Sequence, residues 1–116
     1  MCGIFVSYGP QINLSIHKKL TNQLIHRGPD NQGHLKMNDN MMFSHTRLSI
    51  IDNSKASNQP FSDGYSIVLF NGMIYNYLEI KLKLKNFYNF KTKSDTEVIS
   101  AAYKYWGKKC FNEFNG

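Results

Sequence analysis

The sequence predicts one domain that mixes short strands with amphipathic helices, and three observations support this prediction. The chain has 116 residues, the length of a single modest domain. Apolar residues make up 41% of the chain and aromatic residues 14%, which is enough for a hydrophobic core. Strand-like and helix-like segments follow one another without internal repeats or low-complexity linkers, so nothing divides the chain into two domains.

Three segments are expected to form strands. Residues 3–8 are short and apolar and end before a Gly-Pro pair, which is typical of a buried strand. Residues 41–51 are rich in β-forming side chains and are predicted to form a strand with a continuation, and residues 65–72 end in Asn-Gly, a strong turn signal. Loops are predicted for residues 52–64 and for HRGPDNQG at residues 26–33.

An amphipathic helix is predicted for residues 14–26. The apolar side chains that would form its buried face recur every four positions: Ile16, Leu20 and Leu24. Asn13 or Ser15 could cap its first turn. The helix must end before HRGPD, because Pro29 disfavours helical geometry at the residue before it.

A second helix is predicted towards the end of the sequence. SDTE, at residues 94–97, fits a capping box, and the apolar residues that follow would begin a buried helical face that ends near Gly107. LEIKLKLK, at residues 78–85, is ambiguous. Its apolar and polar residues alternate with a period of two, which favours a strand, but Leu, Glu and Lys are also good helix formers.

The chain carries an excess of positive charge. Its formal net charge is +6, from 14 Lys and Arg against 8 Asp and Glu. Such an excess occurs in proteins that bind nucleic acids or other anions. The lysines are scattered, however, and the densest group, Lys81, Lys83 and Lys85, is interpreted as a solvated face. We therefore expect no nucleic-acid partner.

Nothing in the sequence predicts a membrane partner. No apolar run approaches the ~20 residues that cross a bilayer, and the N-terminus lacks the basic segment and long apolar stretch of a secretory signal. We therefore expect a cytoplasmic location, where Cys2 and Cys110 would not form a disulfide. Because there is no Cys-x-x-Cys pair and no histidine lies at a tight spacing from a cysteine, we expect no metal site.

The cysteine at position 2 is the first candidate for chemistry. If Met1 is removed, Cys2 carries both a thiol and the free α-amine of the chain. The ordinary pKa of such an amine, about 8, is close to that of a thiol, about 8.5, so one residue would supply a nucleophile and the base that takes its proton. The alternative is that Cys2 is a small, half-buried apolar residue in a strand.

Three further segments carry candidate functional groups, each with an ordinary structural alternative. Arg47, within an apolar strand, is either an edge residue, a member of an ion pair, or a fork for a substrate carboxylate. Asn71 and Gly72 form a β-turn or provide two donors for an oxyanion. Asp95 stabilises the positive end of a helix or holds a substrate ammonium there.

Six segments, taken together and in this order, resemble one protein family. They are MCGIF, HRGPDNQG, HTRLSIID, NQPF, NGMIYN and SDTEV, and they cover nearly the whole chain. This set resembles the glutaminase domain of class II glutamine amidotransferases, the type with an N-terminal nucleophile. Each motif alone is weak, but the set in register is specific. LSIID after the arginine and the proline of HRGPD resemble the glutamine-hydrolysing asparagine synthetase branch.

The resemblance implies an α+β fold, the N-terminal-nucleophile hydrolase sandwich, in which two antiparallel sheets are stacked between helix layers. Relatives place a helix after the Asn-Gly turn, so residues 78–85 are expected to be helical. In relatives the segment FNEFNG continues into further strands and then into an ATP-using synthetase domain. Residues 1–116 are therefore expected to be the N-terminal part of a glutaminase domain, with the sandwich incomplete and the synthetase domain absent.

An incomplete sandwich would leave open sheet edges, which invite pairing with another chain. The alternatives are a fragment of a longer protein, a truncated gene product, and a homodimer that completes its own sheet. ATP and Mg²⁺ are expected only for the missing synthetase domain, and no cofactor is expected in this chain. The expected partners are glutamine and a synthetase domain in a longer chain.

The resemblance also implies a mechanism and a set of site residues. The thiolate of Cys2 would attack the side-chain amide of glutamine, with Asn71 and the Gly72 N–H as donors to the oxyanion. Ammonia would leave, and water would hydrolyse the thioester to glutamate. Arg47 would bind the substrate α-carboxylate and Asp95 the α-ammonium. Backbone groups that line the pocket are expected at Leu48, Ser49, Ile50 and Ile51.

One residue departs from the family pattern. Met73 stands where asparagine synthetases usually have a glutamate that helps to hold the substrate ammonium, so we expect weakened glutamine binding. In a full-length relative the ammonia would convert aspartate to asparagine, and the acceptor here is either aspartate or another carboxylate, such as one on a surface sugar. The alternative function, which Met73 and the short chain favour, is a non-catalytic domain that serves binding or assembly.

Overall fold

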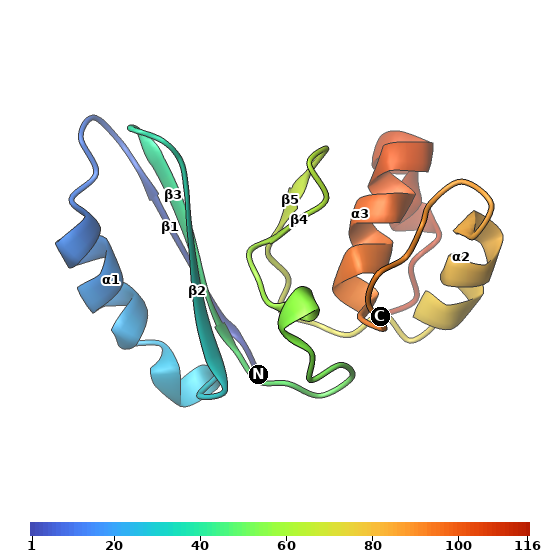
Figure 1. Ribbon diagram of the computed structural model, residues 1–116, viewed down its shortest axis with the longest axis horizontal. Helices are drawn as coiled ribbons and strands as arrows, with labels where there is room; N and C mark the ends of the chain where they lie inside the picture. Colours follow the sequence, from blue (N-terminus) through green and yellow to red (C-terminus); the bar gives the residue numbers. More distant parts are fainter.

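The computed structural model describes residues 1–116 and has an α+β fold of helices and antiparallel strands (Figure 1). In chain order the helices and strands are β1 (Gly3–Tyr8), α1 (Leu14–Asn22), β2 (Asn31–Asn38), β3 (Met41–Arg47), β4 (Phe61–Ser62), β5 (Ile67–Val68), α2 (Tyr77–Leu84) and α3 (Asp95–Trp106). Short 3₁₀ turns are η1 (Ile25–Arg27), η2 (Lys55–Ser57) and η3 (Gly107–Asn112).

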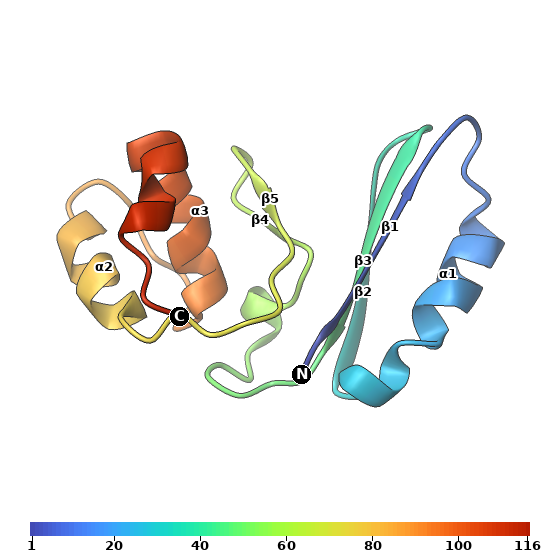
Figure 2. The ribbon, with the colours of Figure 1, turned by 180° about the vertical axis from the view of Figure 1, so that it is seen from behind.

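The first half of the chain is a three-stranded antiparallel sheet with α1 on one face. The strand order is β1-β3-β2, so β3 is central. Gly3 pairs with Thr46 at one end of the sheet, which places Cys2 beside the residues that follow β3. The opposite face of the sheet is turned towards the β4–β5 hairpin and α3, as the views from the front and from behind agree (Figures 1 and 2).

The strand β2 was not predicted: residues 31–33 fall within the loop predicted for residues 26–33, and residues 34–38 were assigned no element. NQGHLKMN is mostly polar and lacks a β-forming composition. It is a strand because its backbone pairs along its length with β3, the central strand of the sheet. Gly33 is needed there for space, since a Cβ at this residue would lie 1.9 Å from the carbonyl oxygen of Gln59.

Two other predicted strands are shorter than expected. Strand β3 ends at Arg47 rather than at residue 51, and β5 comprises only Ile67–Val68 of the predicted residues 65–72. Beyond both ends the backbone bonds to side chains instead of to a neighbouring strand. The Ser49 N–H donates to the carboxylate of Asp30, for example, at 2.7 Å. Residues 3–8 form a strand as predicted, but β1 is an edge strand and is not buried. On the face turned away from α1 its side chains are exposed: Ile4, Val6 and Tyr8.

Helix α1 begins as predicted but buries a different face. Its cap is Asn13, whose side-chain oxygen accepts from the Ile16 N–H at 3.0 Å. The helix ends at Asn22, and the predicted apolar face is wrong, since the side chains of Ile16 and Leu20 are 56% and 47% exposed. The residues that the helix buries are His17 and Thr21.

A cluster of polar side chains between α1 and the sheet explains why the helix buries this face. The His17 ring contacts the hydroxyl of Ser7 through Nδ1 and the hydroxyl of Ser44 through Nε2, both at 2.6 Å. The Ser44 hydroxyl also contacts Nδ1 of His34 at 2.5 Å. Because His17 and Ser44 are buried, leaving their polar atoms unpaired would cost free energy, and these contacts favour the orientation of the helix that turns His17 towards the sheet.

The second half of the chain packs α2, α3 and η3 around one hydrophobic core. Its fully buried members are Ile74, Ile80, Leu84, Val98, Ala101, Ala102 and Cys110. The helical prediction for residues 78–85 is confirmed, since α2 spans Tyr77–Leu84. The four apolar residues that alternate in this segment form two pairs with a spacing of four, and the helix buries one pair, Ile80 and Leu84, and exposes the other, Leu78 and Leu82.

At the start of α3, only one of the two hydrogen bonds of the predicted capping box is present. The Ser94 side chain accepts from the Thr96 N–H at 3.0 Å, as expected. Glu97 does not return to the N–H of Ser94. Its carboxylate instead accepts from the backbone of Lys91 and Thr92 in the preceding loop. The helix ends at Trp106 as predicted, because Gly107 has a φ of +58° that stops it.

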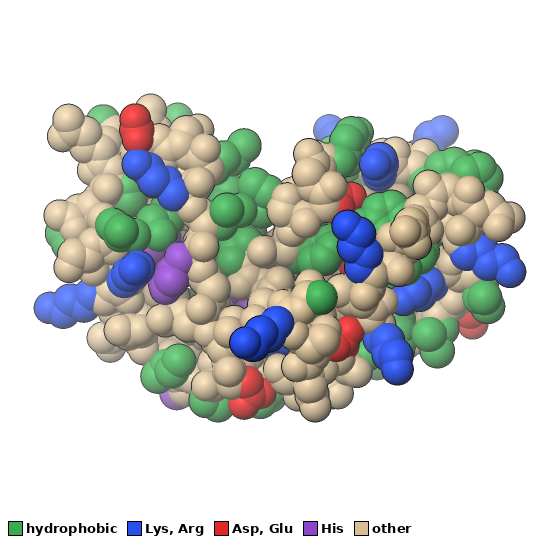
Figure 3. Space-filling model, viewed as in Figure 1, with side chains coloured by type: hydrophobic (Ala, Val, Ile, Leu, Met, Phe, Trp, Pro, Cys, Tyr) green, Lys and Arg blue, Asp and Glu red, His purple; other side chains and the backbone are tan.

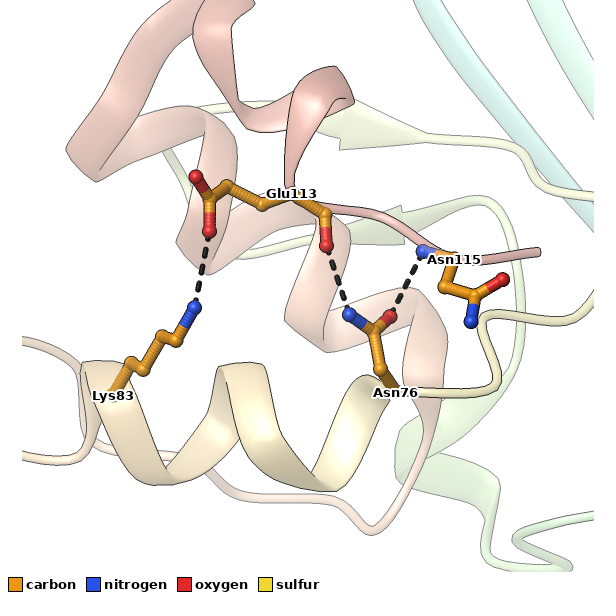
Figure 4. A network of polar contacts seen from close by, with 4 residues as sticks. All are labelled: Asn76, Lys83, Glu113 and Asn115. Atoms are coloured by element: carbon orange, nitrogen blue, oxygen red, sulfur yellow. Dashed lines mark hydrogen bonds and ion pairs between the residues drawn. The ribbon is translucent and has the colours of Figure 1, made fainter.

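The last residues of the chain are tied to the start of α2, as Figure 4 shows. The Asn76 side chain donates to the carbonyl of Glu113 at 2.8 Å and accepts from the N–H of Asn115 at 2.9 Å. The carboxylate of Glu113 also pairs with Lys83 at 3.1 Å. These contacts hold the chain just beyond Asn71 and Gly72 against the helical half.

Lysine and arginine side chains are spread over the face in Figure 3 and form no single patch on it. None of the helices is both long enough and apolar enough to span a lipid bilayer.

The buried His17 predicts a stability that falls in mild acid. Burial, and then the charge of His34, lower the pKa of His17 below its ordinary value. As the pH falls through about 6.5, the unfolded chain therefore binds more protons than the folded chain, and the free energy of unfolding decreases. In His17→Gln, urea unfolding at about pH 7.5 and about pH 5 should show a smaller loss of stability than in the parent.

His34 and His45 also have lowered pKa values, so part of the acid sensitivity should persist in this variant. His26→Gln, at an exposed position, controls for the loss of one histidine. An equal loss of stability in His17→Gln and in the parent would contradict the role given to this ring.

Candidate active site

A cavity of about 320 Å³ lies where the start of β1, the end of β3, the segment after β5 and the N-terminus of α3 meet. It is large enough for an amino-acid-sized ligand. Nine of the ten residues predicted for the site line it: Cys2, Arg47, Leu48, Ile50, Ile51, Asn71, Gly72, Met73 and Asp95. The exception is Ser49, whose backbone is bonded to Asp30 and fixes the loop from outside the cavity.

The thiol of Cys2 is positioned by its neighbours at the end of the sheet. Its Sγ accepts from the Leu48 N–H at 3.4 Å, and its carbonyl accepts from the Nε–H of Arg27 at 3.0 Å. Sequence analysis gave Arg27 no role, although its motif HRGPD was part of the family pattern. Met1 also lines the cavity and is 73% exposed, so the residue before the thiol is accessible for removal.

Arg47 is buried on the central strand, with only 6% of its surface exposed. Its guanidinium donates to the carbonyls of Asp52 and Ser54 and to the side chains of Ser57 and Asn58. All four acceptors are uncharged groups, and no carboxylate pairs with the guanidinium. Two structural alternatives, an edge residue and a member of an ion pair, are therefore wrong. The positive charge is left available to an anion that enters the cavity.

Asp52 ties the loop around Arg47 to the loop before α3. Its carboxylate accepts from the N–H of Ser54 at 2.8 Å and from the N–H of Lys93 at 2.7 Å. Burial opposes ionisation of this carboxylate, but the hydrogen bonds outweigh it and lower the pKa of Asp52 to about 2. Asp52 is thus an ionised carboxylate with a structural role, since its oxygens accept hydrogen bonds from within the chain.

Asn71 and Gly72 follow β5 and leave their donors free. Neither residue makes a hydrogen bond within the chain, by backbone or by side chain. A side chain at position 72 would meet the ring of Phe70, because a Cβ there would lie 2.8 Å from a ring carbon. The Asn71 amide and the unobstructed Gly72 N–H can therefore both donate to a negatively charged oxygen in the cavity.

Asp95 is the first residue of α3 and is almost completely enclosed, with 6% of its surface exposed. Burial raises the pKa of its carboxyl, although hydrogen bonds from Ile74, Thr96 and Ser94 oppose this shift. No cationic side chain neutralises it. The cavity thus contains a buried carboxylate and a buried guanidinium that do not pair with each other, an arrangement that suits a zwitterionic α-amino acid.

Sequence analysis assigned no site role to several residues that line the cavity, and two of these contact each other. Gln59 and Thr96 line the cavity and are joined by a side-chain hydrogen bond of 3.2 Å. The signals that could have found them were the motifs NQPF and SDTEV, which were used only for the family pattern. No group of three His, Cys, Asp or Glu side chains is arranged to hold a metal ion.

A second cavity, of about 720 Å³, is lined mainly by apolar side chains. It shares Phe70, Asn71, Gly72 and Met73 with the first cavity but contains neither the thiol nor the two buried charges. The smaller cavity is therefore the candidate active site, because the groups capable of acyl transfer gather there.

Comparisons with known proteins identify the family of the chain. A family model for the glutamine amidotransferase domain matches residues 1–116. A putative glutamine-hydrolysing asparagine synthetase 2 of Methanocaldococcus jannaschii is 34% identical, over 100% of this chain and 26% of that protein. A probable glutamine-hydrolysing asparagine synthetase of Schizosaccharomyces pombe is 37% identical, over 100% of this chain and 22% of its own length.

Asparagine synthetase B of Escherichia coli, also named as glutamine-hydrolysing, is 33% identical over 100% of this chain and 22% of its own length. The chain thus spans between 22% and 26% of the length of these curated relatives. Since the family model matches every residue from 1 to 116, the chain belongs to the glutamine amidotransferase domain family.

Proposed function

We propose that this chain hydrolyses the side-chain amide of glutamine and releases ammonia, as the glutaminase part of an asparagine synthetase-type amidotransferase. The observation that carries the proposal is the single cavity in which a thiol, two free amide donors and two unpaired buried charges meet. These are the groups that binding of an amino acid and attack on its amide require.

The two charges bind the α-carbon end of glutamine. Arg47 holds the α-carboxylate, for which the guanidinium has a matching fork of donors. Asp95 holds the α-ammonium. Burial has removed water from the Asp95 carboxylate, and the α-ammonium takes the place of this water as its partner. With both groups fixed at the end of β3 and the start of α3, the side-chain amide extends towards Cys2 at the end of the sheet.

The chemistry begins once removal of Met1 has made Cys2 the first residue. The α-amine of Cys2 takes the thiol proton, and the thiolate sulfur forms a bond to the amide carbon of glutamine. The carbonyl oxygen becomes an oxyanion, to which the Asn71 amide and the Gly72 N–H donate. Breakage of the C–N bond, with return of the proton to nitrogen, releases ammonia and leaves a thioester. Water then attacks the thioester and gives glutamate and the free thiol.

The larger architecture is part of the same proposal. The sheet with α1 on its outer face forms one side of an N-terminal-nucleophile sandwich, and α3 lies on the opposite side (Figure 1). Residues 1–116 are the N-terminal part of the glutaminase domain. A synthetase domain in a longer chain would use ATP and Mg²⁺ to activate the acceptor, which is aspartate or another carboxylate. Two expectations stay predictions from the sequence: a homodimer that completes the sheet, and a cytoplasmic location.

The second candidate function is a non-catalytic glutaminase-like domain, which Met73 in the cavity favours. Intact-mass spectrometry after treatment with a glutamine-like electrophile distinguishes the two candidates. A catalytic domain should lack Met1 and carry one adduct on Cys2. A domain that keeps Met1 and takes no adduct would support the non-catalytic function.

Substitution of the nucleophile should abolish activity. Cys2→Ala retains the α-amine but lacks the sulfur that forms the thioester, so glutamine hydrolysis should fall to the background rate. Release of ammonia and glutamate measures this directly. Cys110→Ala, which removes the other thiol from the helical core, should leave hydrolysis in place. Hydrolysis by Cys2→Ala at the parental rate would refute the proposal.

Removal of the Asp95 charge should weaken glutamine binding without lowering the stability of the fold. The raised pKa of Asp95 means that its ionised form destabilises the fold, a cost that is absent below its unfolded-state pKa and fully present above its folded-state pKa. Asp95→Asn keeps an acceptor for the Ile74 N–H. At about pH 7.5 its melting temperature should equal or exceed that of the parent, while KM for glutamine rises by about 10-fold or more.

Thermal unfolding and steady-state kinetics measure these two effects. Asp39→Asn, at an exposed carboxylate paired with Lys36, is the matched control and should keep the parental KM. A parental KM in Asp95→Asn would show that the carboxylate does not hold the substrate ammonium.

Restoration of the family's usual residue should strengthen binding. Met73→Glu adds a carboxylate to the wall of the cavity, and a hydrogen bond to a charged group contributes about 1.5–3 kcal/mol. KM for glutamine should fall by about 10-fold or more in steady-state assays. Met73→Gln, of similar size but uncharged, should stay near the parental value. An unchanged KM in Met73→Glu would contradict the expected effect of this departure.

A further inference from the structure

The residue that precedes Asn71 is held by two side chains from outside its own strand. The Phe70 N–H donates to Oε1 of Gln59 at 2.6 Å, and the Phe70 carbonyl accepts from Nε2 of His45 at 3.2 Å. Phe70 lies beyond the end of β5, so these bonds take the place of a sheet ladder. Both side chains are buried, with 6% of Gln59 and none of His45 exposed.

The contact with Phe70 determines the state of the His45 ring. A carbonyl oxygen can only accept, so Nε2 must carry the proton. Burial lowers the pKa of His45, the Phe70 carbonyl opposes this shift, and the charge of Arg47 adds to it. Nδ1 is buried and has no partner in the chain. The Phe70 carbonyl is therefore the group to which the neutral ring is oriented.

Gln59 connects the two sides of the cavity. While its Oε1 accepts from Phe70, its Nε2 donates to the hydroxyl of Thr96 at 3.2 Å. Thr96 is the neighbour of Asp95 in the first turn of α3. The side-chain amide of Gln59 thus links the backbone of Phe70, which precedes the two oxyanion donors, to the first turn of α3, which carries Asp95.

The two donors have no hydrogen bonds of their own to fix them. Neither Asn71 nor Gly72 makes one within the chain, and both are exposed in the cavity wall. The ring of Phe70 lies against Gly72, within contact distance of a Cβ placed there. The location of the donors therefore depends on how the backbone and ring of Phe70 are held.

We propose that His45 and Gln59 are positioning residues, which hold the main chain of Phe70 on both sides and so set the Asn71 amide and the Gly72 N–H at the oxyanion position. This inference rests on the proposed glutaminase function. Oxyanion donors act mainly in the transition state, and a displacement of about 1 Å can cost about 100-fold in rate. Loss of either holding contact should therefore lower kcat and leave KM nearly unchanged.

The test measures kcat and KM for glutamine hydrolysis by the 116-residue chain after Met1 removal. Gln59→Met and His45→Phe remove the holding contacts with little change in volume, and each should lower kcat about 10- to 100-fold with KM within about twofold. The conservative variants should recover most of kcat. Gln59→Glu keeps acceptors for Phe70 and for the Thr96 hydroxyl, and His45→Gln keeps an N–H near the position of Nε2.

Gln32→Met is the matched control. It removes a glutamine that is hydrogen-bonded to Asn22 on the α1 side of the sheet, and kcat should stay at the parental value. If Gln59→Met does not fold, Thr96→Val removes the far end of the Gln59 contact and should lower kcat by a smaller factor.

The outcomes separate this inference from the function on which it rests. If the parent hydrolyses glutamine in a Cys2-dependent way and the folded variants keep kcat, the positioning role is overturned while the proposed function stands. A raised KM at unchanged kcat would also overturn it, because the side chains would then support ground-state binding. If the parent itself has no Cys2-dependent activity, the proposed function fails first.

Discussion

The antiparallel pairing of β1 with β3 is the constraint on which the candidate site depends. Its register sets Gly3 opposite Thr46, so the residue before β1 and the residues after β3 meet at one end of the sheet. The approach is close, since a Cβ at residue 3 would lie 2.6 Å from the Thr46 hydroxyl and 2.8 Å from the Leu24 Cβ. Only glycine fits there, and a slip of one residue would turn the thiol of Cys2 away from the cavity.

The charges around this end of the sheet fall into two groups with different environments. Asp52 accepts several hydrogen bonds, which outweigh its burial and lower its pKa to about 2, and it serves to join two loops. Asp95 has a raised pKa because burial dominates, and Arg47 is enclosed by neutral acceptors only. Two such charges, each without a counter-ion in the chain, weaken the fold, as buried unpaired charges do. Under the proposed function, a zwitterionic ligand would neutralise both charges when it binds and would so remove this cost.

Local sequence patterns predicted the elements with unequal success, and the reasons are visible in particular residues. The Ser94 cap and Gly107 bound α3 as expected, because caps and stops act within one turn of helix. The alternation in residues 78–85 favoured a strand, whereas the family pattern favoured the helix that is found, with Ile80 and Leu84 in the core. The buried face of α1 was predicted wrongly, because His17 is drawn to two serine hydroxyls on strands distant in sequence. β2 escaped detection for a similar reason, since only its partner strand makes it a strand.

The sequence by itself determined the family, through short motifs whose residue types are dictated by chemistry: a cysteine that can become the first residue, an arginine, an Asn-Gly pair and an aspartate at a helix start. It also determined the N-terminal caps of α1 and α3 and the glycine that ends α3, whose causes are local. The tertiary structure alone decided that these motifs line one cavity, that Arg47 and Asp95 lack counter-ions, and that His45 and Gln59 hold the backbone of Phe70. The reason is physical: burial and long-range hydrogen bonds depend on which distant segments share a neighbourhood, and packing of the sheet against the helices settles that.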